Sequence, residues 1–394
     1  MSRLTTIIKQ PIYNLIDRFT FHQNEHLSFF LEAESWSYER LLDYQLTRIR
    51  AICQHWGLSV NTWDDFYRLP LTGKPDMDMY RPPAGKYNTQ STSGSTGEPR
   101  TIYIPWETWY RKDALFHRSW MWLGRQPHQP VLRLIAGKPH YAWYDWWRND
   151  KVICRDEVDR QVQYVIEYRP YLIHGPGLPI RRLCEEVIKA GHEDVLKDIR
   201  VEWCSTSPEG HRERLEPYLS GFHEQYGLAE LPTVGSPCLY NMHVVMETGV
   251  VEVVADEVVV TDFNNTITPI LRYRTGDEGK IRASDCPCGR AYPILYDVKG
   301  RRTDYYDGPE VKQPIGWWLV SPLGHNYPDV ISAWKVEIYP RSNKMYLNIV
   351  FKEGGNFEAL ETYQDWVKEK LGLSCVIIKC DDASDWKRDL VRVY

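Results

Sequence analysis

The sequence lacks any hydrophobic run long enough to cross a membrane, since no stretch of about eighteen consecutive apolar residues occurs. The apolar stretch at 4–8 ends at Lys9 and Pro11 and is too short for the core of a signal peptide. The sequence also has no internal repeat and no long low-complexity segment. These absences predict a cytoplasmic protein without a membrane partner.

Basic segments with interleaved aromatic side chains are absent, and the formal net charge is only −5 over 394 residues. Nucleic-acid-binding surfaces need clustered lysine and arginine. We therefore expect no nucleic-acid partner and small molecules as substrates. Cysteine is sparse and odd in number, at nine residues, which favours free thiols or a metal site over a disulfide framework.

The length exceeds what one hydrophobic core usually serves, and 43% hydrophobic residues give ample material to bury. Short β-rich runs alternate with helical patterns, which favours an α/β fold. We expect a large N-terminal domain of mixed sheets and helices at 1–304 and a small C-terminal α+β domain at 305–394.

Hydrophobic periodicity predicts individual elements within these domains. In the larger domain it predicts a strand over 101–104, helices over 106–123 and 177–189, and two strands within 250–262 joined around 255–257. In the smaller domain it predicts a β-β-α-β unit with strands over 333–339, 344–351 and 375–379 and a helix over 357–371.

The segment from Ser91 to Arg100 reads STSGSTGEPR and is dense in hydroxyls and glycines. Glycine lets backbone amides approach phosphate oxygens, hydroxyls add donors, and the arginine adds a forked positive charge. The segment therefore predicts a phosphate-binding loop, although taken alone it equally fits a surface linker.

Three later motifs follow this loop in order. They are Tyr226-Gly227-Leu228-Ala229-Glu230, Tyr273-Arg274-Thr275-Gly276-Asp277 and Gly300-Arg301-Arg302-Thr303-Asp304. Together with the loop they resemble the adenylate-forming enzymes, most closely the phenylacetate-CoA ligase branch with its capsule-biosynthesis relatives. The resemblance covers about residues 65–304, and two stretches add to it: 65–70 with Lys74, and 286–290 with Pro293.

The resemblance implies an enzyme that binds ATP and a carboxylic acid and forms an acyl-adenylate and pyrophosphate. Tyr226, beside Gly227, would stack on adenine, and Asp277 would accept hydrogen bonds from the ribose hydroxyls. Arg301 would reach the ribose or a phosphate, and Glu230 would help to hold Mg²⁺ with a loop hydroxyl. The loop residues implied at the phosphates are Ser93, Gly94, Ser95, Thr96, Gly97 and Arg100, with Thr96 also at Mg²⁺. Taken singly, Tyr226-Gly227 also fits an ordinary turn, and Glu230 also fits a solvated acid. Arg274 and Asp277 also fit a surface ion pair.

A second group of residues is Cys238, His243, Cys286 and Cys288, which offers the four ligands of a closed structural zinc site. In the branch named above, cysteines and a histidine at matching motif positions form such a site, so the resemblance supports zinc. The alternative is four unlinked residues.

Three further segments concern the site of the acid, but none of them identifies the acid. The aromatic-rich segment 140–147 fits an aryl-acid pocket but more readily fits core packing. Related sequences place the segment 174–177 near the acid pocket, and 205–210 resembles the segment that lines the nucleotide and acyl sites.

The sequence departs from the family after Asp304, where the family's glycine-bearing loop is not recognisable in 305–315. Lys387 is the candidate for the family's adenylation lysine, but its usual flanking glycine is absent and it equally fits a solvated charge. If Asp304 is the hinge, the small domain rotates between half-reactions.

The expected acyl acceptor is coenzyme A. The alternatives are an amine, a hydroxyl or a carrier-protein thiol, or a catalytically idle nucleotide-binding homologue. The sequence leaves the oligomeric state open, a homodimer included.

Overall fold

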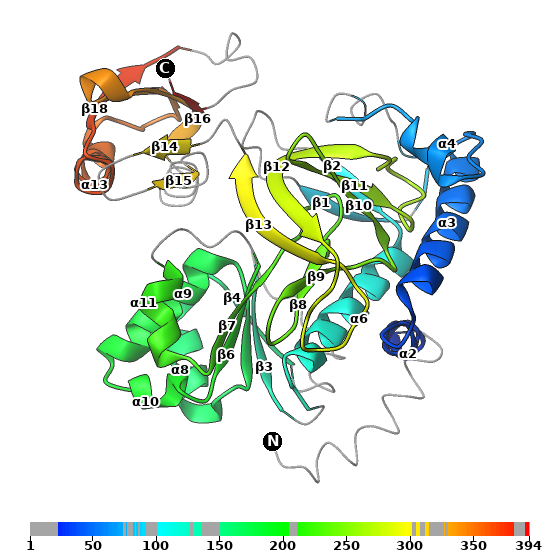
Figure 1. Ribbon diagram of the computed structural model, residues 1–394. Helices are drawn as coiled ribbons and strands as arrows, with labels where there is room; N and C mark the ends of the chain where they lie inside the picture. Colours follow the sequence, from blue (N-terminus) through cyan, green and yellow to red (C-terminus); the bar gives the residue numbers. More distant parts are fainter. Residues whose placement is uncertain are drawn as a thin grey trace. The chain divides into compact units, whose positions relative to one another are not determined.

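The computed structural model describes residues 23–73, 76, 82, 84–85, 87–91, 101–126, 129–135, 150–204, 211–301, 305–307, 312–314, 327, 330–381 and 391–393 (Figure 1). The chain divides into two compact units. The first comprises 1–90, 102–275 and 279–298, and the second comprises 91–101, 276–278 and 299–394. The domain boundary expected at 304 stays a prediction, because residues 302–304 lie outside the described ones.

The first unit begins with the helices α2 (Gln23–Ala33), α3 (Tyr38–His55) and α4 (Trp63–Tyr67). Ser37 caps α3 by accepting from the backbone N–H of Arg40, and Thr62 and Asp65 form a capping box on α4. The buried amide of Gln45 on α3 donates to the carbonyl oxygens of Met246 and Gly249 at 3.2 and 2.7 Å. This amide ties the helical N-terminal region to the segment about 200 residues further on.

A five-stranded parallel sheet follows in the order β4-β3-β5-β6-β7. Its strands are β3 (Val131–Ile135), β4 (Asp150–Cys154), β5 (Leu172–Gly175), β6 (Arg200–Cys204) and β7 (Gly221–Gln225). The crossovers carry α8 (Val158–Tyr168), α9 (Gly177–Lys189), α10 (Glu193–Leu196), α11 (His211–Leu215) and η1 (Glu216–Tyr218) (Figure 1). Apolar side chains of α8 and α9 pack with those of β3, β5 and β6 into one core. All five strands are parallel, so their carboxyl ends meet at one edge.

A six-stranded sheet has the order β10-β11-β12-β13-β9-β8. Its strands are β8 (Gly235–Pro237), β9 (Met242–Val244), β10 (Gly249–Val254), β11 (Glu257–Asp262), β12 (Tyr273–Arg282) and β13 (Ile294–Arg301). Ala255 and Asp256 join β10 to β11 with φ values of 52° and 66°, the left-handed backbone that two-residue hairpin turns require. The predicted strand pair is therefore confirmed. The strands β1 (Asn88–Ser91) and β2 (Thr101–Ile104) form a separate pair, and α6 (Trp106–Trp122) follows β2.

The second unit contains a four-stranded sheet in the order β18-β17-β16-β19. Its elements are β16 (Ile331–Tyr339), η3 (Pro340–Ser342), β17 (Lys344–Phe351), η4 (Glu358–Leu360), α13 (Glu361–Leu371), β18 (Ser374–Lys379) and β19 (Val391–Val393). Apolar side chains of β16, β17 and α13 form its core, and Gly372 ends α13 in the left-handed conformation, with φ 66°. The predicted β-β-α-β unit is confirmed, and β19 was not predicted.

The predicted elements over 101–104, 106–123 and 177–189 are β2, α6 and α9, with a difference of at most one residue at an end. The segment after 304, where no family loop is recognisable, includes β14 (Tyr305–Asp307) paired antiparallel with β15 (Lys312–Pro314). Within the described part of the chain, no helix combines the length and the apolar character that a membrane span needs.

Candidate nucleotide and metal sites

The carboxyl ends of the parallel strands carry the polar side chains of the predicted acid and nucleotide segments. His174 lies at the end of β5, Cys204 ends β6 and Gln225 ends β7. In open sheets of this kind ligands bind beside the carboxyl ends of the strands. Tyr226, the first residue of the second motif, directly follows β7.

The turn after Tyr226 has a fixed backbone. Tyr226 donates its N–H to the carbonyl oxygen of Gly235 at 3.1 Å, and its own carbonyl oxygen accepts from Gly235 at 2.9 Å. Leu228 donates to the carbonyl oxygen of Leu231 at 2.9 Å. At Gly227 an added Cβ would lie 2.0 Å from the carbonyl oxygen of Pro232, so this close approach requires glycine.

Glu230 lies in this turn and is only 6% exposed. Its Oε1 accepts a hydrogen bond of 2.9 Å from the hydroxyl of Tyr273, a buried residue at the start of β12. The second and third motifs are therefore joined by a contact between their side chains. Sequence reasoning missed this role of Tyr273, because no local pattern marks the partner of a carboxylate 43 positions away.

A cavity of about 470 Å³ runs beside β7 and β13. This volume lies within the range of small-molecule pockets. Tyr226, 7% exposed, lines it together with residues of β7, of the β8–β9 hairpin and of β13: Phe222, His223, Gln225, Tyr240, Tyr296 and Val298. Burial lowers the pKa of His223 to about 4, so its imidazole is neutral at pH 7. The cavity thus combines aromatic side chains with a neutral imidazole and with charged groups of both signs, those of Arg200, Arg212, Glu216, Glu224 and Asp297.

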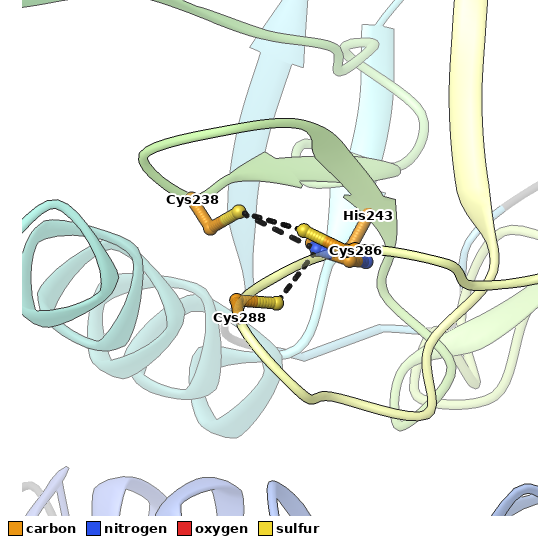
Figure 2. A group of neighbouring side chains, drawn as sticks. All are labelled: Cys238, His243, Cys286 and Cys288. Atoms are coloured by element: carbon orange, nitrogen blue, oxygen red, sulfur yellow. Dashed lines mark hydrogen bonds between the residues drawn. The ribbon is translucent and has the colours of Figure 1, made fainter.

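The four predicted zinc ligands lie together (Figure 2). Cys238 directly follows β8, His243 lies in β9, and Cys286 and Cys288 lie in the loop between β12 and β13. The Sγ atom of Cys238 lies 3.6 Å from Sγ of Cys286 and 3.5 Å from Nε2 of His243, and Sγ of Cys288 lies 3.3 Å from the same Nε2. Ligands about 2.1–2.3 Å from a tetrahedral zinc ion are separated by about 3.4–3.8 Å. The donor set and its spacing fit zinc.

The surroundings of these residues also fit a metal. Nδ1 of His243 lies 2.9 Å from the carbonyl oxygen of Tyr292, which places the ring proton on Nδ1 and leaves Nε2 free toward the sulfurs. Burial lowers the pKa of His243, so the ring is neutral. The backbone N–H of Asn241 donates to Sγ of Cys238 at 3.3 Å, and its side-chain amide donates to Sγ of Cys286 at 3.2 Å. Burial raises the pKa of the Cys238 thiol to about 11, and these hydrogen bonds act against that rise because they favour the thiolate forms that bind metal.

A second group with metal-binding residue types is His174, Glu202 and Cys204. Glu202 accepts from Ser119 and Trp120 at 2.5 and 2.8 Å, and its Oε2 lies 2.6 Å from Nδ1 of His174. Protein donors thus occupy both carboxylate oxygens, and burial raises the pKa of the Cys204 thiol well above its ordinary value. This group is a hydrogen-bond network that fixes the ends of β5 and β6.

Several predicted site residues lie outside the described residues: Ser93, Gly94, Ser95, Thr96, Gly97, Arg100 and Lys387, and likewise Lys74 and the segments 140–147 and 205–210. Arg301 ends β13, but its side chain is not described. Asp277 is half-buried within β12, next to Gly276 with φ 83°. Arg274 forms an ion pair of 2.5 Å with Glu257, so the alternative pairing of Arg274 with Asp277 is wrong. The physical reason is the β11–β12 pairing, which brings Glu257 alongside Arg274.

No protein-family model matches the sequence, and no curated protein matches it significantly. The structure is similar to 2-hydroxyisobutyryl-CoA ligase in the postadenylation state with R3-HIB-AMP, with a TM-score of 0.62 and 17% identity. It is similar to the same ligase with 2-HIB-AMP and CoA in the thioesterification state, with a TM-score of 0.62 and 18% identity. Each match covers 92% of this chain and 91% of the other. An open conformation of that ligase matches with a TM-score of 0.57 and 18% identity over 88% of this chain and 90% of the other.

The chain therefore has the fold of the acyl-adenylate-forming ligases, which confirms the expectation from the order of its motifs. It also confirms the expected α/β architecture. The narrower likeness to the phenylacetate-CoA ligase branch stays a prediction.

Proposed function

We propose that the protein activates a carboxylic acid with ATP, forming an acyl-adenylate and releasing pyrophosphate. The observation that carries this proposal is the position of Tyr226. The motif residue expected to stack on adenine lines a cavity of about 470 Å³ that runs along the whole of β7, in a chain with the fold of acyl-adenylate-forming ligases. The motif carboxylate Glu230 lies four residues further on in the same turn.

The chemistry requires charge neutralisation around the triphosphate. Glu230 and Thr96 are the proposed Mg²⁺ ligands, and bound Mg²⁺ supplies charge compensation to the phosphates. The hydroxyl of Tyr273 holds one oxygen of Glu230, which fixes the direction of the carboxylate. Asp277 and Arg301 are proposed at the ribose, and the segment 93–100 at the β- and γ-phosphates.

The proposed acyl acceptor is the thiol of coenzyme A. The likeness at a TM-score of 0.62 to a ligase with CoA in the thioesterification state supports it. Transfer to an amine, a hydroxyl or a carrier-protein thiol is the second candidate, favoured by the unrecognisable family loop after residue 304. An idle homologue is the third, and the buried Glu230 with its fixed direction argues against it.

The domain organisation, 1–304 and 305–394, with a hinge at Asp304 and Lys387 at the α-phosphate, belongs to the same proposal. So do the cytoplasmic location and the small-molecule acid as substrate. A structural zinc ion at Cys238, His243, Cys286 and Cys288 is proposed on the ligand spacing. With four protein ligands this ion would be closed to substrate and would stabilise the loop that carries Cys286 and Cys288.

Acid-dependent exchange of labelled pyrophosphate into ATP tests the first half-reaction, screened over aryl, short-chain and amino acids. Glu230→Ala should abolish exchange and leave the fold intact, because the variant loses a metal ligand. The matched control is Glu193→Ala, at an exposed residue at the start of α10. Exchange that survives in Glu230→Ala would remove this residue from the metal site. If no acid tested supports exchange in the wild-type protein, the idle homologue is favoured. Product analysis with coenzyme A then decides the acceptor.

A further inference from the structure

Lys112 on α6 has an unusual environment for an ammonium group. Its Nζ lies 4.5 Å from the ring centroid of Trp109 and 5.7 Å from that of Phe116. With the Gln90 amide oriented by its hydrogen bonds, Oε1 of Gln90 accepts from Nζ at 3.0 Å. From the described residues, Nζ therefore contacts two aromatic rings and a neutral amide.

Lys112 is connected to the motif that contains Glu230 through Gln90. The amide nitrogen of Gln90 donates to the carbonyl oxygen of Ala229 at 2.9 Å, and Ala229 directly precedes Glu230. Gln90 itself directly precedes Ser91, where the predicted phosphate loop begins. One amide thus joins Lys112 to the residue that precedes Glu230, the proposed metal ligand.

Lys112 is also close to the predicted acid segments. The ring of Phe116, one turn further along α6, lies 4.8 Å from the ring of His174. Cys204, at the end of β6, is among the electrostatic neighbours of Lys112. His174 and Cys204 begin or directly precede the segments 174–177 and 205–210. The ammonium therefore lies near His174, which begins one of these segments, and near Cys204, which precedes the other.

Among the residues that the structure describes, the charge of Lys112 has no acid partner at contact distance. Its charged neighbours are Asp113 and Arg133. Asp113 is already bound to Arg133 at 3.1 Å, and within the described residues no carboxylate lies within 4 Å of Nζ. Burial lowers the pKa of Lys112 to about 8, with Arg133 adding to the effect, yet the amine stays mainly protonated at pH 7. For a half-buried ammonium, loss of hydration without a compensating anion is costly, and an anionic ligand would relieve that cost.

We propose that Lys112 binds a second carboxylate of the acid substrate, one that is not activated, so that the preferred substrates are dicarboxylic acids. This inference rests on the proposed function. The activated carboxylate loses its charge when the adenylate forms and would leave the ammonium unpaired. A non-reacting carboxylate keeps its charge through both half-reactions and matches a half-buried cation.

Pyrophosphate exchange with matched acid pairs, such as butyrate with succinate and benzoate with terephthalate, tests this inference. The wild type should favour the dicarboxylic member of a pair in kcat/KM. For the dicarboxylic member, Lys112→Met should lower kcat/KM by about 10- to 100-fold through a higher KM, because the variant loses one charged hydrogen bond. For the monocarboxylic member, its rate should stay unchanged. Lys112→Arg should retain part of the preference, and the control Lys189→Met, at an exposed residue of α9, should behave as wild type.

A second measurement does not depend on activity. Reductive methylation of the wild-type protein, followed by peptide mass spectrometry, reports the access of reagent to each lysine. Succinate or terephthalate should slow methylation of Lys112, whereas butyrate or benzoate and the exposed Lys189 should show no effect.

Three results would overturn the inference. They are equal loss on both members of each acid pair, a change in the KM for ATP in place of that for the acid, and the absence of protection by any dicarboxylate. The second result would assign Lys112 to a phosphate. Acid-dependent exchange that Lys112→Met leaves unchanged overturns this inference alone. If no acid supports exchange in the wild type, the proposed function itself is overturned.

Discussion

Gly227→Ala tests whether the turn at 226–233 determines activity. The added Cβ would lie 2.0 Å from the carbonyl oxygen of Pro232 and 2.6 Å from its carbonyl carbon. Both atoms belong to the backbone, so no side chain can move aside, and contacts of a real Cβ below 3.0 Å essentially do not occur. The two strands of the turn must therefore separate by at least about 1 Å, which moves Tyr226 or Glu230.

A displacement of about 1 Å in a reacting assembly costs on the order of 100-fold in rate. We expect Gly227→Ala to reduce pyrophosphate exchange by about that factor and to destabilise the protein by about 1–3 kcal/mol, the usual cost of overpacking. The control is Gly85→Ala, where the added Cβ meets no atom within 4 Å and φ is not positive. Exchange at the wild-type rate in a folded Gly227→Ala protein would refute the reasoning, because Tyr226 and Glu230 would then tolerate the displacement.

Two further predictions concern the metal group and a buried acid. Cys286→Ser should lower the zinc content and the melting temperature together, measured by elemental analysis and calorimetry, with Cys380→Ser as control; wild-type protein purified free of metal would contradict the site. Burial raises the pKa of Asp262 to about 6, because the folded protein favours the protonated carboxyl. The stability that the carboxyl contributes is therefore fully present below pH 3.8 and is lost as pH rises through 6. Asp262→Asn should therefore be more stable than the wild type at pH 8, by at most about 3 kcal/mol in denaturant unfolding, and equally stable near pH 3.8. Equal stability at both values of pH would place the Asp262 carboxyl in an environment that does not disfavour its charge.

Local patterns predicted the elements whose signals are contained in short segments. The helix over 177–189 is α9 to the residue, because its apolar side chains recur on one face and glycine follows it at 191. The hairpin around 255–257 was predicted for the same kind of reason. The strand order β4-β3-β5-β6-β7 could not be predicted, since it depends on packing between segments up to about 90 residues apart.

In the candidate site, too, some features could be predicted from local motifs, and others depend on contacts between distant segments. The four residues of the metal group were expected from motif positions and lie together. The contact of Tyr273 with Glu230 and the Gln90 amide between Lys112 and Ala229 were not expected, because each joins residues that are distant in sequence and carries no spacing signal. The alternative interpretation of the third motif, an Arg274–Asp277 ion pair, is wrong, since the partner of Arg274 depends on the pairing of neighbouring strands, which brings Glu257 to it.

The metal group and the proposed nucleotide cavity share one hairpin, which explains how a metal without an open ligand position would affect catalysis. Cys238 lies in the β8–β9 hairpin, and Leu239, Tyr240 and Asn241 of the same hairpin line the cavity. Gly235, the first residue of β8, holds the backbone of Tyr226 through two hydrogen bonds. Zinc bound to Cys238 and His243 would fix both strands of this hairpin against the loop that carries Cys286 and Cys288. The cavity wall and the proposed adenine-stacking side chain would then keep their positions, although the ion touches neither nucleotide nor acid.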